Sequence, residues 1–305
     1  MFAEVAALAL AAMAAQQIRI PLGKAPRQVE RPIAPIETAG PAFAATCKDW
    51  DEWDKPAPPV RIHANTYLVG TCGISAILIT GTEGHILIDG GTETGADLIA
   101  ANIRRLGFKL GDVKILLHSH EHFDHVGGIG RLQQLSGAQL VASSAAAKVF
   151  ETGTAGLGDP QAGMHKPFPS AQVDRVIQDG ETVRLGNLFL TAVATPGHTP
   201  GALSWHWGSC DGGVCRRIVY ADSLSPVSRD DYRFSDRPAY VATYRASIAK
   251  VAGLECDILL TPHPSASKMV TRLAARSLEN GNACRDHAAS LTKALDERLA
   301  KEQAK

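Results

Sequence analysis

Four histidines and two acidic residues lie within eight positions of this chain, in the sequence HSHEHFDH at residues 118–125. The simplest interpretation is a solvated histidine-rich loop, but imidazoles and carboxylates are also the ligands that zinc accepts. His120 and His122 alternate, so an extended backbone directs both side chains toward one point. Asp124 and His125 are adjacent and diverge toward a neighbouring point if a tight turn follows. The spacing therefore predicts two metal positions, of the kind that lie about 3.5–4 Å apart in two-metal hydrolytic sites.

Each predicted metal position still lacks a ligand, because catalytic zinc is held by about three protein side chains and completed by water. His198 lies in the sequence TPGHTPG and His263 in LLTPHPS, each just after a predicted strand. The flanking prolines and glycines restrict the backbone and hold each side chain at low entropic cost. A lone histidine after a strand is usually structural, but two at matching strand ends beside this cluster indicate further ligands.

At these residues the chain resembles the metallo-β-lactamase superfamily. Residues 120–125 match its His-x-His-x-Asp-His signature, and the GHT and PHP sequences around His198 and His263 match its later zinc motifs. The resemblance extends over about residues 60–269. Within the superfamily the chain resembles subclass B3, on the sequences YADSLS and TPHPSAS and on the histidine that opens the signature. Subclass B1 would carry a zinc-binding cysteine near Ser223, and subclass B2 an asparagine in place of that first histidine.

The resemblance implies a zinc-dependent hydrolase that opens the amide bond of penicillins, cephalosporins and carbapenems and so confers antibiotic resistance. It implies two zinc ions per chain, the first held by His120, His122 and His198, the second by Asp124, His125 and His263. Zinc lowers the pKa of water far enough to give hydroxide near neutral pH, which would attack the lactam carbonyl. Asp124 would orient that hydroxide and is the predicted catalytic residue. The alternative is another hydrolase of the same fold, a lactonase or thioesterase.

The sequence YADSLS at residues 220–225 has two interpretations. In thioesterases of the superfamily an aspartate of this stretch bridges the metals, which would be the role of Asp222. In chains that resemble subclass B3 a neighbouring serine faces the site instead. Ser223 and Ser225 alternate after a predicted strand, so both can hydrogen-bond the carboxylate of a substrate. We expect the serine arrangement and retain the bridging aspartate as the alternative.

The remaining polar residues near the motifs receive other interpretations. Asp89 precedes two glycines and would either orient a metal-bound histidine or cap a turn. His118 is expected in the core or at the surface, and Glu121 in solvent. The histidines outside any motif are expected to be structural or exposed: His63, His85, His165, His206 and His287.

The elements that carry these motifs are short apolar strands and amphipathic helices. Apolar runs bounded by glycine predict strands at 61–69, 74–80, 85–89, 114–117, 139–142, 175–178, 182–185, 189–195, 203–207, 218–220 and 258–260. Helical spacing predicts helices at 94–106, 127–135, 145–150, 240–251 and 281–301. One strand-rich half is followed by another, which predicts an α/β fold, an αβ/βα four-layer sandwich. Composition alone leaves a doubly wound α/β fold open.

The N-terminal part predicts export. Residues 3–15 form an apolar run of the length of a signal-peptide core, and Ala12 and Ala14 suit its cleavage site, although no basic residue precedes the run. We expect residues 1–15 to be a signal peptide, 16–58 an extended arm packed over the domain, and 59–305 the metallo-β-lactamase domain. The expected location is the periplasm.

Six cysteines support this location, because disulfides persist in oxidising compartments. Six allow 15 pairings, between which the sequence does not choose. The Asp-Gly-Gly turn between Cys210 and Cys215 favours a hairpin that joins those two. For the others we expect Cys47–Cys72, which would attach the arm to the core, and Cys256–Cys284, which would attach the C-terminal helix to the last strand.

Charge and loop length complete the expectations. Lys and Arg together number 31, as do Asp and Glu, so the formal net charge is zero and no nucleic-acid or membrane partner is expected. We expect a monomer that acts on a small molecule. Residues 152–169 are rich in Gly and Pro, and a loop of this length is usually functional. We expect it to be a mobile flap over the metals, with Leu157, Met164 and Phe168 toward the ligand.

Overall fold

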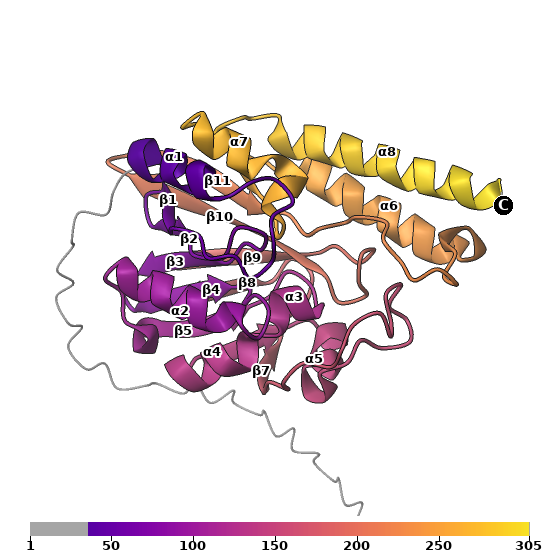
Figure 1. Ribbon diagram of the computed structural model, residues 1–305, viewed down its shortest axis with the longest axis horizontal. Coiled ribbons are helices and arrows are strands. Elements are labelled where there is room, and N and C mark those ends of the chain that lie inside the picture. The colour runs from indigo at the N-terminus through magenta and orange to yellow at the C-terminus, as the bar shows by residue number, and fades with distance from the viewer. Residues whose placement is uncertain (1–35, 305) are drawn as a thin grey trace, which may run out of the picture.

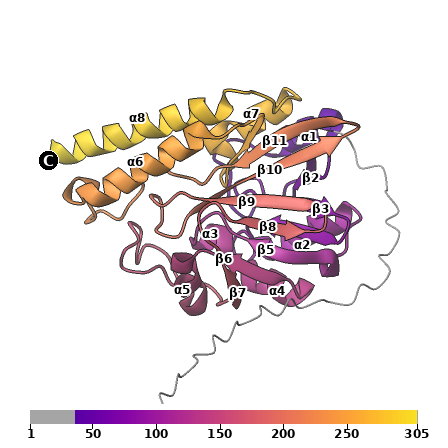
Figure 2. The same cartoon turned by 180° about the vertical axis from the view of Figure 1, so that it is seen from behind.

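The computed structural model describes residues 36–304, which form two β-sheets packed against each other. The strands are Val60–His63 (β1), Thr66–Leu68 (β2), Ile77–Gly81 (β3), Gly84–Ile88 (β4), Val113–Leu117 (β5), Gln139–Ala142 (β6), Val173–Val176 (β7), Thr182–Leu185 (β8), Leu188–Ala194 (β9), Leu203–Asp211 (β10), Val214–Tyr220 (β11) and Ile258–Leu260 (β12). The first sheet has seven strands in the order β1-β2-β3-β4-β5-β6-β7, and the second has five in the order β12-β11-β10-β9-β8. The long β10–β11 hairpin is clearest from behind (Figure 2).

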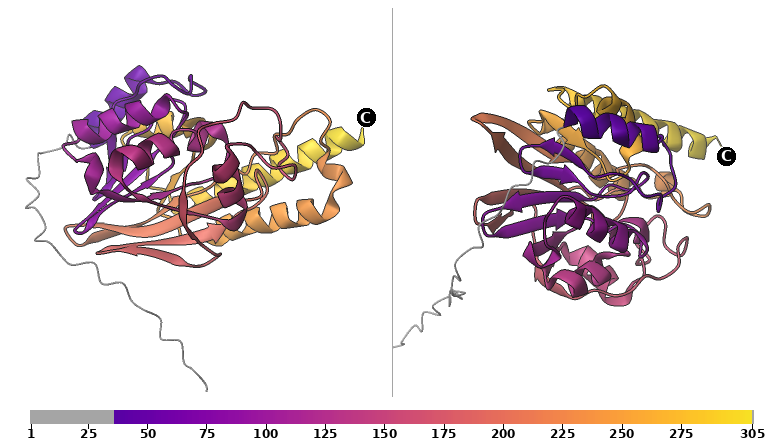
Figure 3. Two further views of the ribbon diagram at one scale, coloured as in Figure 1. Left: turned by 90° about the horizontal axis from the view of Figure 1, so that it is seen from below. Right: turned by 60° about the vertical axis from the view of Figure 1, so that its left-hand side comes forward.

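Helices flank both sheets (Figures 1 and 3). They are Ile36–Thr46 (α1), Gly95–Arg105 (α2), Phe123–Val126 (α3), Ile129–Ser136 (α4), Ser144–Thr152 (α5), Pro238–Gly253 (α6), Met269–Ala274 (α7) and Ala283–Gln303 (α8). Of these helices, α1 and α7 also contribute to the core between the sheets. In Figure 1, α6 and α8 lie side by side at the top, and α2, α4 and α5 pack on the outer face of the first sheet in the lower half of the view. The arrangement is the predicted αβ/βα sandwich of four layers, not the doubly wound alternative.

Three apolar clusters separate the four layers. Ile88 of the first sheet and Trp205 of the second belong to the cluster between the sheets. Leu87, the chain neighbour of Ile88, points to the opposite face of the first sheet and packs with Ile99 of α2. This alternation follows from the two-residue period of a strand, and a strand buried on both faces is apolar throughout. Tyr244 of α6 belongs to the third cluster, between the second sheet and its helices.

Two predicted elements differ from the structure. Residues 16–58 were expected to be extended, but α1 occupies Ile36–Thr46 and buries Phe43 in the core between the sheets. Gly40 and Pro41 lower the helix propensity of this segment, so only tertiary packing identifies it. The single strand expected at 61–69 is a hairpin of β1 and β2, turned at Ala64, which has a positive φ of 44°. Helix α7 was not predicted.

All three predicted disulfides are confirmed: Cys47–Cys72, Cys210–Cys215 and Cys256–Cys284. The first joins the segment after α1 to the turn after β2. The third joins the start of α8 to the segment before β12. The proposed signal peptide and the first part of the arm lie outside the described residues. No helix within residues 36–304 is long and apolar enough to cross a membrane.

Buried His287 of α8 predicts a pH dependence of stability. Burial lowers the pKa of its imidazole to about 4, from 6.5. The unfolded chain therefore binds one more proton than the folded chain between these pH values, so this stability is present above pH 6.5 and lost as the pH falls toward 4. The full loss is on the order of 3 kcal/mol. Urea unfolding of His287→Gln at several pH values should show a shallower decline than the unmodified protein; equal slopes would contradict the assignment.

Candidate metal centre

Each motif follows the end of a strand in one of the two sheets. β5 leads to His120 in the first sheet, whereas β9 and β12 of the second lead to His198 and His263. The structure thus brings together side chains from both sheets. Of the six predicted ligands only His263 is partly exposed, with a side chain that is 25% accessible.

Three histidines form the first set. The ligand atoms of His120, His122 and His198 lie within 4.8 Å of one another. Each imidazole gives one ring nitrogen to a protein oxygen, which leaves the other for a metal. Nδ1 of His120 is 2.8 Å from a carboxylate oxygen of Asp222, Nε2 of His122 is 3.1 Å from Asp159, and Nδ1 of His198 is 2.8 Å from the Ser225 carbonyl oxygen.

The second set consists of Asp124, His125 and His263. Nε2 of His125 lies 3.0 Å from Oδ2 of Asp124 and 3.1 Å from Nε2 of His263. Nε2 of His263 lies 3.4 Å from the same carboxylate oxygen. His120 also has a ligand atom within 4.8 Å of those of Asp124 and His125. It therefore lies where the two sets meet.

The buried carboxylates at the centre fit a cation. Five carboxylates are buried here: Asp89, Glu121, Asp124, Asp159 and Asp222. Within residues 36–304 none of them forms an ion pair with a lysine or arginine, and the ion pairs of the four aspartates are with histidines. Buried charges in proteins are paired or coordinate metals. The donor set of imidazoles and carboxylates therefore fits a divalent metal ion.

The protonation states favour the same conclusion. Burial lowers the pKa of His120 well below its usual value, that of His198 to about 3 and that of His263 to about 4. These imidazoles are neutral near pH 7, the form that binds a metal. Burial alone would raise the pKa of Asp124, but the charge and hydrogen bond of His125 hold it well below its usual range. Burial lowers the pKa of His125, but the charge and hydrogen bond of Asp124 outweigh that effect and raise it.

The 222–225 segment lies behind the first set of histidines. One oxygen of Asp222 accepts from Nδ1 of His120, and the other accepts from the Leu224 backbone, at 3.3 Å. Oγ of Ser223 is buried without a hydrogen-bond partner. Oγ of Ser225 lies 3.2 Å from Nδ1 of His198. Asp222 thus contacts Nδ1 of the His120 imidazole, and the Ser223 hydroxyl has no hydrogen-bond partner.

Glu121 is not in solvent, so that expectation was wrong. Its carboxylate is buried and accepts hydrogen bonds from Oγ1 of Thr199, at 2.6 Å, and from the backbone of Gly201, at 2.7 Å. It joins the loop of the first motif to the loop of His198. Strand β5 ends at Leu117, before the motif, so the alternation of a strand does not apply to Glu121. His118 lies in the core, where its Nε2 accepts from the Ser143 backbone.

Asp89 caps the turn that begins the motif. It accepts from the backbone and the hydroxyl of Ser119, at 2.6 and 2.8 Å, and from the Tyr220 hydroxyl at 2.7 Å. Its φ of 66° is unusual for a residue other than glycine. Nδ1 of His125 is 3.9 Å away, beyond hydrogen-bond distance. Of the two interpretations, the contacts favour the turn cap.

Residues 152–169, hereafter the flap, lie against the first set of histidines. Asp159 contacts His122, and Nε2 of Gln161 is 3.4 Å from Nε2 of His198. The predicted position is therefore confirmed, while its mobility stays a prediction. Leu157 is 94% exposed, so it does not pack against the histidines as expected. Phe168 packs against the helix-side core and also lines a small cavity together with His122. Only the unusual length of the loop indicated its contribution.

Three ring contacts at the centre were not predicted. The Trp53 ring, on the segment after α1, lies 5.5 Å from that of Phe123 and 6.1 Å from that of His263. His165, expected to be structural or exposed, lies 4.8 Å from the Phe123 ring. Single aromatic and histidine residues outside a motif carry no signal that separates them from other surface residues.

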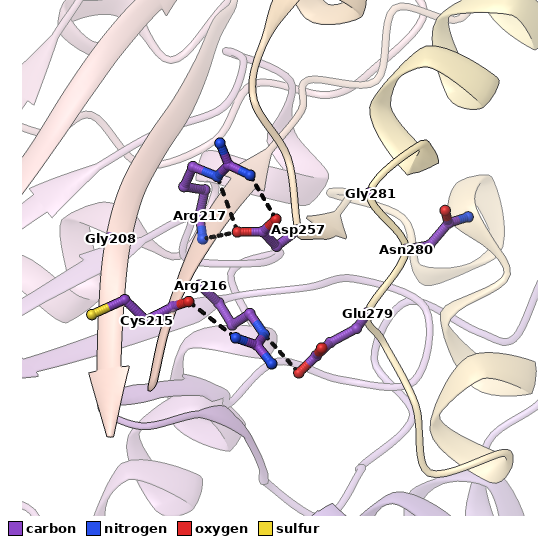
Figure 4. A pocket seen from close by; sticks show the side chains of 8 residues that line it. All are labelled: Gly208, Cys215, Arg216, Arg217, Asp257, Glu279, Asn280 and Gly281. Atoms are coloured by element: carbon purple, nitrogen blue, oxygen red, sulfur yellow. Dashed lines mark hydrogen bonds and ion pairs between the residues drawn. The ribbon is translucent and has the colours of Figure 1, made fainter. Parts of the chain in front are cut away.

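A hollow of about 600 Å³ lies elsewhere, between β11 and the segment before α8 (Figure 4). Its charged side chains form pairs: Arg217 with Asp257 at 2.9 Å, and Arg216 with Glu279 at 2.9 Å. None of the six predicted ligands lines it. Because its arginines are paired and it holds no cluster of metal ligands, the hollow is not the candidate site.

The chain is similar to known proteins over this same region. The model of the metallo-beta-lactamase superfamily matches residues 69–263, more than half of the chain. MEM-A1, a subclass B3 metallo-beta-lactamase from a soil metagenome library, is 44% identical, with 83% of this chain and 99% of that chain covered and a TM-score of 0.80. The chain belongs to the metallo-β-lactamase superfamily, in subclass B3. MIM-2, another metallo-β-lactamase of known structure, is 58% identical, with 87% and 98% covered and a TM-score of 0.84.

Curated relatives match this metallo-β-lactamase more distantly. The chain spans about half the length of the curated relatives it matches. N-acyl homoserine lactonase AttM of Agrobacterium fabrum is 32% identical over 151 residues, which are 42% of this chain and 57% of the lactonase. The similarity to MIM-2 and MEM-A1 is stronger and covers nearly their full length.

Proposed function

We propose that this metallo-β-lactamase binds two zinc ions and hydrolyses the amide bond of penicillins, cephalosporins and carbapenems. The observation that carries the proposal is the pair of three-ligand sets that meet at His120. Three protein ligands per metal leave a coordination position open for water, which is typical of catalytic rather than structural zinc. The full-length similarity to subclass B3 enzymes supports the β-lactam substrate.

The donor set suits zinc. His120, His122 and His198 would hold one ion, and Asp124, His125 and His263 the other. Imidazole is a zinc ligand of choice, whereas magnesium and calcium prefer oxygen alone. When bound, zinc supplies hydroxide near neutral pH and polarises the carbonyl of the substrate.

The side chains of this chain then orient the reactants. The pKa of Asp124 is held below its usual range, and its ligand atom lies within 4.8 Å of those of His120 and His125, so it could accept a hydrogen bond from the attacking hydroxide while it holds a metal. Asp222 and the Ser225 carbonyl fix which nitrogen His120 and His198 present. Glu121 holds the two ligand loops together. No nucleophilic side chain is required, since the attacking hydroxide derives from water.

Ser223 and Ser225 would bind the carboxylate of the substrate. The hydroxyl of Ser223 has no protein partner, and that of Ser225 can turn outward because its carbonyl still accepts from His198. A hydrogen bond to a charged group contributes about 1.5–3 kcal/mol. The double variant Ser223→Ala/Ser225→Ala should therefore lose about tenfold or more in kcat/KM, mainly through KM.

The metal content of the serine variant, measured beside its kinetics, should equal that of the unmodified protein. Ser290→Ala, an exposed position on α8, is the control. Unchanged KM in the double variant would contradict the serine assignment. Asp222→Ala should weaken metal binding through His120 rather than remove a bridging ligand, so a loss of one full equivalent of zinc at saturating zinc would favour the bridging alternative.

Location and assembly belong to the same proposal. The three disulfides favour an oxidising compartment, and we propose the periplasm, reached through a signal peptide at residues 1–15. There the enzyme would destroy β-lactams before they act and so confer resistance. We propose that it works as a monomer, since all six ligands come from one chain.

A direct comparison of substrates tests the proposed activity. Purified protein with zinc should hydrolyse a carbapenem, a penicillin and a cephalosporin with kcat/KM in the ordinary enzyme range, about 10⁴–10⁸ M⁻¹s⁻¹. An N-acyl homoserine lactone, the substrate class named for AttM, should be turned over far more slowly. Efficient lactone opening with no β-lactam hydrolysis would replace the proposal with the lactonase alternative.

A further inference from the structure

Asp159 of the flap contacts a ligand that lies 37 positions away in the chain. Its carboxylate oxygens are 3.1 and 3.3 Å from Nε2 of His122, and its side chain is 2% exposed. We infer that Asp159 is a positioning residue for His122, and that seating of the flap thereby controls how tightly the first metal is held. The inference rests on the proposed function only in taking the three histidines as metal ligands.

The contact decides which nitrogen His122 presents. A neutral imidazole carries one proton, and the nitrogen that bears it cannot bind a metal. When Nε2–H donates to Asp159, Nδ1 becomes the free nitrogen and the ring orientation is fixed. Without Asp159 the ring would divide its time between two tautomers and two orientations. Removal of a carboxylate that holds a metal-bound histidine in this way typically lowers metal affinity about 10–100-fold.

Little else explains why a carboxylate is buried at this point. Within the described residues, Asp159 forms no ion pair with a lysine or arginine side chain; its other carboxylate contact is the backbone of Gln161, at 2.6 Å. That backbone contact caps a turn, which an asparagine or serine side chain would also do. A buried carboxylate is costly without a charged or hydrogen-bonded partner, and His122 is that partner.

A second chain segment holds Asp159 in place. Arg229 donates from its backbone to the Pro160 carbonyl, at 3.0 Å, and from Nη1 to the Asp159 carbonyl, at 3.3 Å. Arg229 lies four positions after Ser225, whose carbonyl accepts from Nδ1 of His198. The flap and the 225–229 segment therefore each contact one ligand of the first set. The hydrogen bonds of Arg229 join these two segments to each other.

The C-terminal helix supports this arrangement. Arg298 of α8 donates from Nη2 to Oγ of Ser228, at 2.7 Å, and to the carbonyl of Tyr232, at 3.2 Å. Contacts thus run from α8 through the 228–232 segment to the flap and on to His122. A flap that leaves this position takes Asp159 away from the imidazole, so the metal is held less tightly when the flap opens.

Metal affinity tests the inference without any substrate. Zinc binding to Asp159→Ala, Asp159→Asn and the unmodified protein is measured by competition with a chromophoric chelator. We expect Asp159→Ala to bind zinc about 10–100-fold more weakly at the more affected metal position. The zinc affinity of Asp159→Asn should be intermediate, because its amide oxygen still accepts from Nε2–H. Leu157→Ala, which alters an almost fully exposed flap side chain, is the matched control and should bind as the unmodified protein does.

Nuclear magnetic resonance of the zinc-loaded protein separates positioning from a merely structural role. The imidazole N–H groups that face Asp222, Asp159 and the Ser225 carbonyl should give signals protected from exchange, and Asp159→Ala should lose one of them. Arg229→Ala leaves the carboxylate present but removes the Nη1 contact, so it should weaken zinc binding by a smaller factor. This variant carries the test if Asp159→Ala does not fold.

Unchanged zinc affinity with all protected signals retained in Asp159→Ala would overturn the inference. Weaker affinity in the Leu157→Ala control as well would also overturn it, because the loss would then follow any disturbance of the flap. Failure of the proposed function is a separate outcome. An unmodified protein that binds zinc but leaves β-lactams intact would refute the substrate, while the binding and resonance measurements would still decide the role of Asp159.

Discussion

Asp124→Asn should reduce kcat/KM for a carbapenem by about 10²–10⁴, the range that a correctly placed acid–base group supplies. The amide keeps the shape of the side chain but removes the negative charge that lies 3.0 Å from Nε2 of His125 and 3.4 Å from Nε2 of His263. Both roles of the residue are lost together, because it would hold the second metal and orient the attacking hydroxide. The measurements are steady-state kinetics and zinc content at several zinc concentrations.

The control for Asp124 is Asp97→Asn on α2. The Asp97 side chain is 70% exposed and forms an ion pair with the exposed Arg131. An exposed ion pair contributes about 0–1 kcal/mol to stability. Asp97→Asn should leave both kinetics and zinc content unchanged. An Asp124→Asn enzyme with unmodified kcat/KM would show that the second set of ligands takes no part in turnover.

Removal of the Cys256–Cys284 disulfide should lower the free energy of unfolding by about 3–4 kcal/mol. In the chain-entropy model a cross-link stabilises by restricting the unfolded chain, and the effect grows with the length of the closed loop. These cysteines are 28 positions apart and both are buried where α8 packs against the second sheet. Denaturant unfolding of Cys256→Ala/Cys284→Ala measures the loss.

The Cys210–Cys215 pair provides the comparison within the same chain. Its cysteines are five positions apart, and they face each other in the β10–β11 hairpin. The same model gives about 2 kcal/mol for so short a loop. Cys210→Ala/Cys215→Ala should therefore be the more stable of the two double variants. The opposite order would indicate that loop length does not control the effect here.

The metal motifs could be predicted from the sequence because each ligand is a rare residue type in a fixed local setting. His120 and His122 alternate, and His198 and His263 lie between prolines or glycines after strands. Such settings can be recognised in the sequence even where the direction of a single side chain cannot. The four-layer sandwich could be predicted from local patterns as well. Continuous apolar runs indicate central strands that are buried on both faces, and the order of these runs along the chain indicates two strand-rich halves.

The contacts behind the ligands could not be predicted, because they join residues far apart in the chain. Glu121 was expected in solvent, and only the approach of Thr199 and Gly201 makes its burial favourable. Asp159 is one acidic residue in a loop without periodicity, and nothing in its neighbours reveals that His122 lies beside it. Helix α1 was missed for a related reason, since packing of Phe43 overrides the local effect of Gly40 and Pro41.

The central claim is that two zinc ions in one site perform the hydrolysis, and a metal titration tests it most directly. Protein stripped of metal with a chelator is returned to zinc in steps, and bound zinc and carbapenem hydrolysis are measured on the same samples. We predict no hydrolysis without metal, recovery on addition of zinc, and saturation at two zinc ions per chain. Hydrolysis that persists after complete removal of metal, or saturation of binding with no recovery of activity, would contradict the account.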